Sequence, residues 1–447
     1  MEAWSRFLDT FFNWEVIERY FPAIMKGVVV TIEIAAAVVV TGTLLGLALA
    51  IVRTFRLLAV NALIVVFVDM LRALPPLVLV LLVYFGLPNI GINLPSFAVL
   101  WLVLALVLAA FAEEIFWAGI LSIPKGQWEA ARSTGLGFLG TLAYIVLPQA
   151  IRLTVPPLTN RTIAITKNTA LGTVIGVGEI LNQATPIVFR QCHAAHDGSD
   201  RLCDPVHPGC RARPLPRDPV RLAQAVMESI VQQFFNLAIM ERALPLVLAG
   251  LEQTIVICLI VIPLGLAGGL AFAIISLSRL RSVRWAAIAG IDFFRAIPPL
   301  VLLIFIYAGL PFADLRPSPM TAVAIAFFLN TSSYYGEIYR AGIESVGYGQ
   351  WDAARSTGLR GYQTLAYVVL PQAVRNVLPD LVSNTVEVVK LTSIASVVAL
   401  PELLYSADMA RSVTFNSSPI VLAAAIYLVM LWPIVRLIIR LERRVAA

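Results

Sequence analysis

The sequence predicts an all-α integral membrane protein, built as a tandem parallel repeat with about nine transmembrane helices. The 447-residue chain is 59% hydrophobic and only 13% charged, whereas soluble domains carry roughly 25% charged residues. Many of its apolar runs reach the ~20 residues that a helix needs to cross a bilayer. The stretch at 127–152 returns at 350–375, with nineteen of its 26 positions identical.

Nine apolar segments are expected to span the membrane. The first half contains those at about 27–52, 58–86, 96–121 and 148–166. The second half repeats them at about 250–275, 285–311, 318–343 and 371–389, and adds 418–440. The predicted domains are an amphipathic lead-in at 1–26, a first repeat at 27–184, an anomalous segment at 185–226 and a second repeat at 227–447.

Basic residues indicate the orientation of these segments in the cell's inner (plasma) membrane. Arg53, Arg56, Lys125 and Arg132 place the end of the first segment and the loop at 122–147 on the cytoplasmic side. The loop at 87–95 has no Lys or Arg and is expected outside. Basic residues follow the first and last segments of the second half in the same way.

The two copies are related by a constant offset of 223 residues, without gaps from about residue 22 to 182. Matched pairs include Thr31 and Thr254, Asp69 and Asp292, Arg72 and Arg295, Glu114 and Glu337, Lys167 and Lys390, and Glu179 and Glu402. Both copies have the same predicted orientation. The duplication is therefore parallel, unlike the inverted repeats of many secondary transporters.

The repeated stretch begins with charged residues, is interrupted by glycine and then becomes apolar. The hydrocarbon of a bilayer offers no partners for the charges and free backbone groups of such a segment. We therefore expect a short helix, a turn and a second short helix outside the membrane. Gly135 and Gly358 supply turns that a Cβ atom would hinder. Two equal surface elements indicate two docking points for a soluble partner; an ordinary cytoplasmic loop is the alternative.

These residues resemble the EAA loop of ABC import permeases. That pattern places Gly six residues and Pro nineteen residues after the acidic residue. The first copy has Glu129-Ala130-Ala131, Gly135 and Pro148, and the second has Asp352-Ala353-Ala354, Gly358 and Pro371, with Asp replacing the usual Glu. The resemblance covers about 20–185 and 228–447.

Other segments are similar to the polar amino-acid uptake branch of that family. They are Arg72-Ala73-Leu74-Pro75-Pro76, Tyr335-x-Glu337-x-x-Arg340-Ala341-Gly342-Ile343 and Lys390-x-Thr392-Ser393. The first copy departs from the branch at Trp117-Ala118, where Arg and Gly are usual, and at Asn168-Thr169-Ala170.

The resemblance implies a type I importer transmembrane domain, in which each loop is a coupling helix seated in a groove of a cytoplasmic ATPase dimer. The implied coupling residues are Glu129, Ala130, Ala131, Arg132, Gly135, Asp352, Ala353, Ala354, Arg355 and Gly358. A periplasmic or extracellular solute-binding protein would deliver a small-molecule substrate, and no nucleic acid is implied. ATP would bind to the partner: the sequence has no Gly-x-x-x-x-Gly-Lys-Ser/Thr loop and no hydrolytic constellation, so the chain is expected to be neither an enzyme nor a holder of cofactors.

Charged residues at membrane depth are candidates for a translocation path, because such residues usually face protein or water. They are Glu114, Glu337, Lys167, Lys390 and Glu387, with Glu33 as a further member. Structural pairing between helices is the alternative. Pro75-Pro76 and Pro298-Pro299 are expected to break or kink their helices and to serve as gating points.

Two other classes of protein remain open. A secondary transporter or channel would use no ATPase and would leave the repeated loops without a partner. A membrane-embedded enzyme is disfavoured, because all three histidines lie in the anomalous segment.

The segment at 185–226 allows three interpretations. Cys192, His193, His196, Cys203, His207 and Cys210 are compatible with a metal site. Its Pro- and Arg-rich sequence is also compatible with a disordered linker. The third interpretation is that two adjacent permease genes were joined by a frameshift or a sequencing error near 185–192, because the first copy lacks a counterpart of the last apolar segment. Residues 193–223 can be encoded so that the next reading frame resembles the end of the chain and then stops.

Sequencing the DNA across codons 185–226 tests the frameshift. We expect a single-base change that restores a fifth apolar segment to the first copy. A single intact frame through this region would rule the interpretation out.

Overall fold

The computed structural model describes residues 14–184 and 219–445. Within these ranges all regular structure is helical. The chain forms two compact units that divide between Phe234 and Phe235. They are called here the first unit (14–234) and the second unit (235–445), and each is described by itself.

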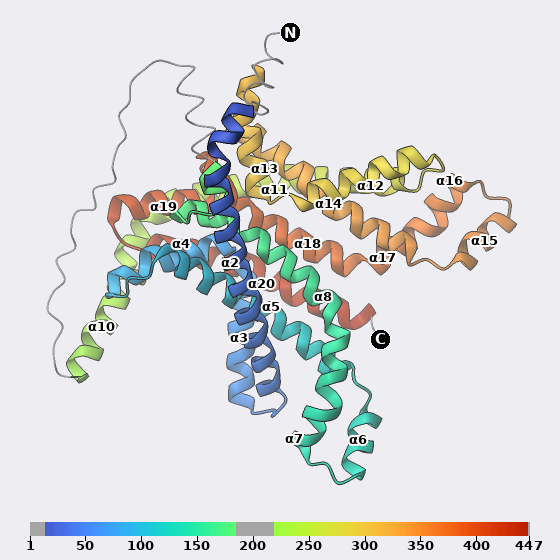
Figure 1. Ribbon diagram of the computed structural model, residues 1–447, viewed down its shortest axis with the longest axis horizontal. Helices are drawn as coiled ribbons and strands as arrows, with labels where there is room; N and C mark the ends of the chain where they lie inside the picture. The colour runs from blue at the N-terminus through green and yellow to red at the C-terminus, as the bar shows by residue number, and fades with distance from the viewer. Residues whose placement is uncertain (1–13, 185–218, 446–447) are drawn as a thin grey trace. The chain divides into compact units, whose positions relative to one another are not determined.

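The first unit is a succession of helices separated by short turns (Figure 1). In order they are α2 (Trp14–Arg53), α3 (Leu58–Ala73), α4 (Pro76–Gly86), the 3₁₀ helix η1 (Leu87–Ile90), α5 (Ser96–Ser122), α6 (Lys125–Ser133), α7 (Phe138–Thr141), the π-helix η2 (Leu142–Val146), α8 (Leu147–Lys167), the 3₁₀ helix η3 (Asn168–Ile175) and α10 (Pro219–Phe234).

The second unit repeats this order. Its helices are α11 (Leu237–Ser276), α12 (Arg281–Ala296), α13 (Pro299–Ile304), the π-helix η4 (Phe305–Gly309), η5 (Leu310–Ala313), α14 (Pro319–Glu344), α15 (Tyr348–Ser356), α16 (Gly361–Gln363), the π-helix η6 (Thr364–Val369), α17 (Leu370–Asn376), α18 (Leu378–Leu391), η7 (Thr392–Val398), α19 (Leu403–Thr414) and α20 (Ser418–Val445).

The repeat seen in the sequence extends to the helix boundaries. A shift of 223 residues carries both ends of α2 onto α11, of α3 onto α12 and of α6 onto α15. Helix ends are set by the local sequence, so the two copies begin and end these helices at equivalent residues. The all-α tandem parallel repeat is confirmed.

Each unit contains one broken helix. The chain bends by 103° between α3 and α4 and by 98° between α12 and α13. Pro75 and Pro298 precede these bends, and Pro76 and Pro299 begin the next helix. A proline fixes its own φ and disfavours the α conformation of the residue before it, so a Pro-Pro pair ends one helix and starts another. The predicted breaks are confirmed.

Six helices in the described ranges are long and apolar enough to cross a membrane, or up to eight if each bent pair is one span. The ninth expected span corresponds to α14, which is long enough at 26 residues but does not meet the same criterion. Its C-terminal half is polar, with Asn330, Thr331, Ser332 and Ser333 all buried. The polar groups of α14 therefore face protein rather than lipid.

Glycines allow the long helices of each unit to pack closely. A Cβ atom on Gly46 of α2 would lie 2.5 Å from the Cβ of Ala112 on α5. One on Gly269 of α11 would lie 2.5 Å from the Cβ of Tyr335 on α14. Small residues at such crossings are typical of membrane helices, whose association depends on close contact.

In each unit a threonine on the first long helix is hydrogen-bonded to the backbone near the end of the repeat. Thr31 accepts a hydrogen bond from the backbone N–H of Ile180 at 3.3 Å, and Thr254 accepts one from Leu403 at 3.1 Å. Next to these contacts, Glu179 accepts the N–H groups of Leu181 and Asn182, as Glu402 does those of the corresponding residues. The matched Thr and Glu pairs thus have the same structural role in both copies.

The predicted anomalous segment falls mostly outside the described residues. Its six Cys and His residues, the metal interpretation and the expected position of a fifth helix all lie there, apart from 219–226, which begin α10. The domain limits and the frameshift therefore stay predictions.

Exchanging Gly269 for alanine tests the close packing. Because the new methyl group would overlap Tyr335, we expect Gly269→Ala to lower the free energy of unfolding by about 1–3 kcal/mol. Gly290→Ala on α12 is the matched control, since its Cβ would meet no atom within 4 Å. Thermal melting of the purified protein followed by tryptophan fluorescence measures both, and equal melting temperatures would contradict the packing argument.

Candidate functional site

The repeated stretches form two short tips, each at the end of a longer helix. The first tip (124–147) runs through α6, α7 and η2 into α8, and the second tip (347–370) runs through α15, α16 and η6 into α17. Figure 1 shows the first tip at the end of α8 and the second at the end of α17. The expected arrangement of short helix, turn and short helix is present in both copies.

A glycine with a left-handed backbone ends the first helix of each tip. Gly135 has a φ of +88° and Gly358 one of +86°. The N–H of Gly135 bonds to the carbonyl of Arg132 at 3.0 Å, and that of Leu136 reaches back to Ala131 at 3.4 Å. Non-glycine residues adopt this backbone only at a cost, which explains glycine at this point in both copies.

The predicted coupling residues share one exposure pattern. Glu129, Ala130, Arg132 and Gly135 are exposed, whereas Ala131 is buried. The second tip has the same pattern: Asp352, Ala353, Arg355 and Gly358 are exposed and Ala354 is buried. One alanine of each pair thus packs against its own unit. The other alanine is exposed, and its methyl side chain is small enough for another helix or groove to approach the tip closely.

A glutamine pair that sequence reasoning missed holds each tip to the helix that follows. The Nε2 atom of Gln149 on α8 donates to the Oε1 atom of Gln127 on α6 at 3.3 Å. Gln372 and Gln350 repeat this bond at the same distance. All four glutamines lie at identical positions of the repeat, which was the available signal.

The tips differ in their aromatic contacts. In the first, Phe138 stacks on Trp128 and meets Phe55 edge-on, both with ring centroids 5.8 Å apart. The second tip has Gly361 at the position of Phe138. Its Tyr348 and Tyr362 are instead exposed. The first tip is therefore braced against its own unit, while the second presents more aromatic surface to solvent.

Most of the predicted path residues are paired within their own unit. Glu114 pairs with Arg72 of α3, and Glu337 lies 3.6 Å from Arg295 of α12. Lys390 donates to Glu387 at 2.9 Å. These pairs fit the structural alternative, in which charges at membrane depth are neutralised between or along helices.

The remaining path candidates have different surroundings. Lys167 on α8 is half-buried, and the position that matches Glu387 is Ala164 in the first unit. Glu33 is exposed on α2. The two copies therefore do not present the same charges along the corresponding helices.

One buried pair was not anticipated from the sequence. Nη1 of Arg53 at the end of α2 lies 2.8 Å from Oε1 of Glu113, and the Arg53 guanidinium carbon lies 4.5 Å from the centroid of the Trp117 ring. In the second unit these positions are Ser276, Gly336 and Arg340. All three positions therefore differ between the copies, and this shared departure from the repeat was the signal available in the sequence.

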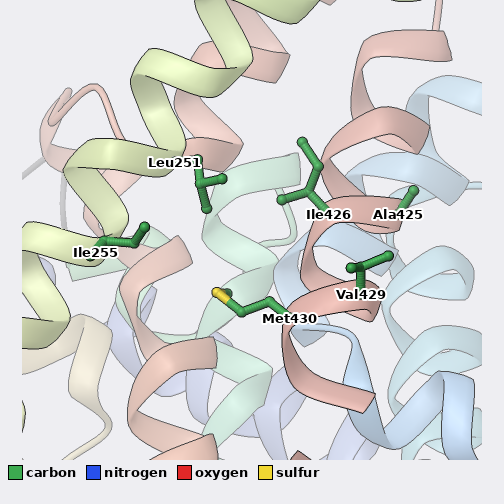
Figure 2. Close-up of a pocket in the computed structure, with 6 residues that line it drawn as sticks. All are labelled: Leu251, Ile255, Ala425, Ile426, Val429 and Met430. Atoms are coloured by element: carbon green, nitrogen blue, oxygen red, sulfur yellow. The ribbon is translucent and has the colours of Figure 1, made fainter. Parts of the chain in front are cut away.

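An apolar pocket of about 400 Å³ lies between α11 and α20 (Figure 2). Its lining side chains are Leu251, Ile255, Ala425, Ile426, Val429 and Met430. None of them can pair with a carboxylate or an ammonium group. This pocket is therefore unsuited to a polar solute and matches a lipid-facing surface.

Comparison with known proteins gives two matches to one family. The profile described as "Binding-protein-dependent transport system inner membrane component" matches residues 15–188 and 262–447. The probable amino-acid ABC transporter permease protein YckA of Bacillus subtilis (strain 168) is 35% identical over 197 residues, which are 44% of this chain and 87% of the relative. The glutamine transport system permease protein GlnP of Escherichia coli (strain K12) is 32% identical over 209 residues, 45% of this chain and 94% of the relative.

A solved structure titled "Crystal structure of an amino acid ABC transporter with histidines" is 35% identical. Its TM-score is 0.43, and the match covers 46% of this chain and 96% of that one.

Replacing Gly135 by alanine tests the turn of the first tip. Its Cβ would meet no neighbour, so the expected cost of about 1 kcal/mol comes from the left-handed backbone alone. We expect faster amide hydrogen exchange at Leu136, whose N–H caps α6. Gly126→Ala, inside α6 and equally unobstructed, should leave that exchange unchanged; equal effects of the two variants would show that backbone strain is not the reason for Gly135.

Proposed function

The chain belongs to the family of binding-protein-dependent transport system inner membrane components, and on that premise we propose that it moves polar amino acids inward by coupling to a separate ATPase through its two tips. It is a multi-pass plasma-membrane protein and the membrane subunit of an ABC importer. The observation that carries the proposal is the presence of two tips with the same backbone turn and the same exposed residues.

The proposed mechanism uses each tip as a lever. A cytoplasmic ATPase dimer would receive Ala130 and Ala353 in a groove on each subunit, where small residues permit close approach. The neighbouring acidic residue and Arg132 or Arg355 are exposed and available to pair across the interface. ATP binding would draw the two ATPase subunits together and move both tips, and hydrolysis would reset them. In this scheme the partner performs the hydrolysis and the chain itself is not an enzyme.

The stiffness of the tip supports this transmission. The glutamine bond between Gln127 and Gln149 ties the tip helix to α8, which enters the membrane. A displacement of α6 would therefore pass to a membrane helix rather than be absorbed by the turn. The second tip has the same connection through Gln350 and Gln372.

An amino-acid substrate is supported by the relatives, which include amino-acid and glutamine permeases. A solute-binding protein outside the membrane would deliver it, as the name of the family indicates. The proposed path residues are Glu114, Glu337, Lys167, Lys390 and Glu387. Because most of them are paired in this structure, they would contribute to a path only when the helices that carry them move.

Enlarging the exposed alanines tests the coupling. In membranes that hold the chain with its ATPase and binding protein, Ala130→Phe and Ala353→Phe together should abolish ATP-driven uptake of labelled glutamine and other polar amino acids. The ATPase should no longer co-purify with the chain, because the bulky rings would not enter its grooves. Ala59→Phe, at an exposed alanine of α3 outside both tips, is the matched control and should keep both.

The same membranes distinguish the alternative of a secondary transporter or channel. Uptake that continues without ATP, or that survives both alanine replacements with the ATPase still bound, would contradict the proposed coupling.

A further inference from the structure

An arginine at each helix break is paired to a glutamate on a neighbouring long helix. Arg72 lies in the last turn of α3, just before Pro75, and pairs with Glu114 of α5. Arg295 has the same place on α12 and lies 3.6 Å from Glu337 of α14. Each ion pair therefore links the helix that ends at the break (α3 or α12) to an unbroken helix (α5 or α14).

The second unit has an additional arginine at this pair. Arg340 lies three residues after Glu337 on α14 and binds both of its carboxylate oxygens, with Nη2 at 2.6 Å and Nε at 3.1 Å. Glu344, one turn further, binds Nη1 of Arg340 at 2.6 Å. The first unit has Trp117 at the position of Arg340 and Leu121 at that of Glu344, so α5 carries no such arginine.

The extra arginine weakens the link across the second break. Arg340 occupies two of the roughly four lone-pair sites of the Glu337 carboxylate, which leaves fewer for Arg295. The 3.6 Å separation between Arg295 and Glu337 is longer than a hydrogen bond. Arg295 also lies 4.0 Å from Asp292 on its own helix and 5.6 Å from the centroid of the Tyr334 ring. Both side chains are about one-third exposed, at 34% and 29%, so solvent screens what remains of the attraction.

We infer that Arg340 is a positioning residue that loosens the break between α12 and α13 by drawing Glu337 away from Arg295. The second unit is then the one whose broken helix moves during transport, while the first unit keeps its break braced by Arg72 and Glu114. The inference rests on the proposed function only in assigning that movement to transport. Arg340 lies eight residues before the start of α15, so the loosened pair is on the helix that leads directly into the second tip.

Amide hydrogen exchange of the full chain in lipid nanodiscs tests the inference without any partner protein. The probes are the N–H of Leu302, bonded to Pro298 at 3.1 Å, and that of Leu79, bonded to Pro75 at 3.3 Å. We expect Leu302 to exchange about fivefold faster than Leu79, as a weakened ion pair allows.

Three substitutions should change the difference between the two exchange rates. Arg340→Gln should release Glu337 to Arg295 and slow exchange at Leu302 toward the rate at Leu79. Arg340→Lys, which keeps the charge but cannot bind in the same fork geometry, should give an intermediate rate. Trp117→Arg places an arginine three residues after Glu114 and should speed exchange at Leu79. Trp117→Gln, which removes the same ring from Arg53 without adding a charge, is its control and should leave exchange at Leu79 unchanged.

The outcomes are distinct. If Arg340→Gln leaves exchange at Leu302 unchanged or speeds it, the inference is wrong. If that variant does not fold, as judged by thermal melting, an unchanged rate at Leu79 in Trp117→Arg overturns the inference instead. If Ala130→Phe and Ala353→Phe keep the ATPase bound, the proposed function fails, but these exchange rates are measured without a partner and are unaffected. The two proposals therefore fail separately.

Discussion

The bilayer's inability to satisfy charges and exposed peptide groups is the constraint on which this structure depends. It predicts that the charged, glycine-turned stretches of the two tips lie outside the membrane. It also requires a partner for each arginine near a helix break, which Glu114 and Glu337 provide. The free energy needed to place an unpaired charge or peptide group in lipid thus accounts for both features.

The parallel duplication applies this constraint twice with the same orientation. Because the helix boundaries of the two copies coincide after a shift of 223 residues, each tip follows the same number of membrane segments in its own unit. An inverted repeat would place the two tips on opposite faces. In a parallel repeat each tip keeps the same place in the helix order of its own copy.

Much of the fold could be predicted from the backbone preferences of single residues. The breaks at Pro75 and Pro298 follow from proline geometry, and the turns at Gly135 and Gly358 follow from the freedom of glycine. The charged pairs were harder, because which arginine meets which glutamate depends on how separate helices pack. Arg53 of α2 with Glu113 of α5 became visible only in three dimensions, although both positions differ between the copies.

Membrane sidedness of the two tips tests the central claim most directly. Ser133→Cys and Ser356→Cys, each in a cysteine-free chain, place one thiol on an exposed position of each tip. A membrane-impermeant thiol reagent should label both in inside-out vesicles and neither in right-side-out vesicles. Labelling of the two from opposite sides, or protection of either thiol by the bilayer in both preparations, would contradict the account.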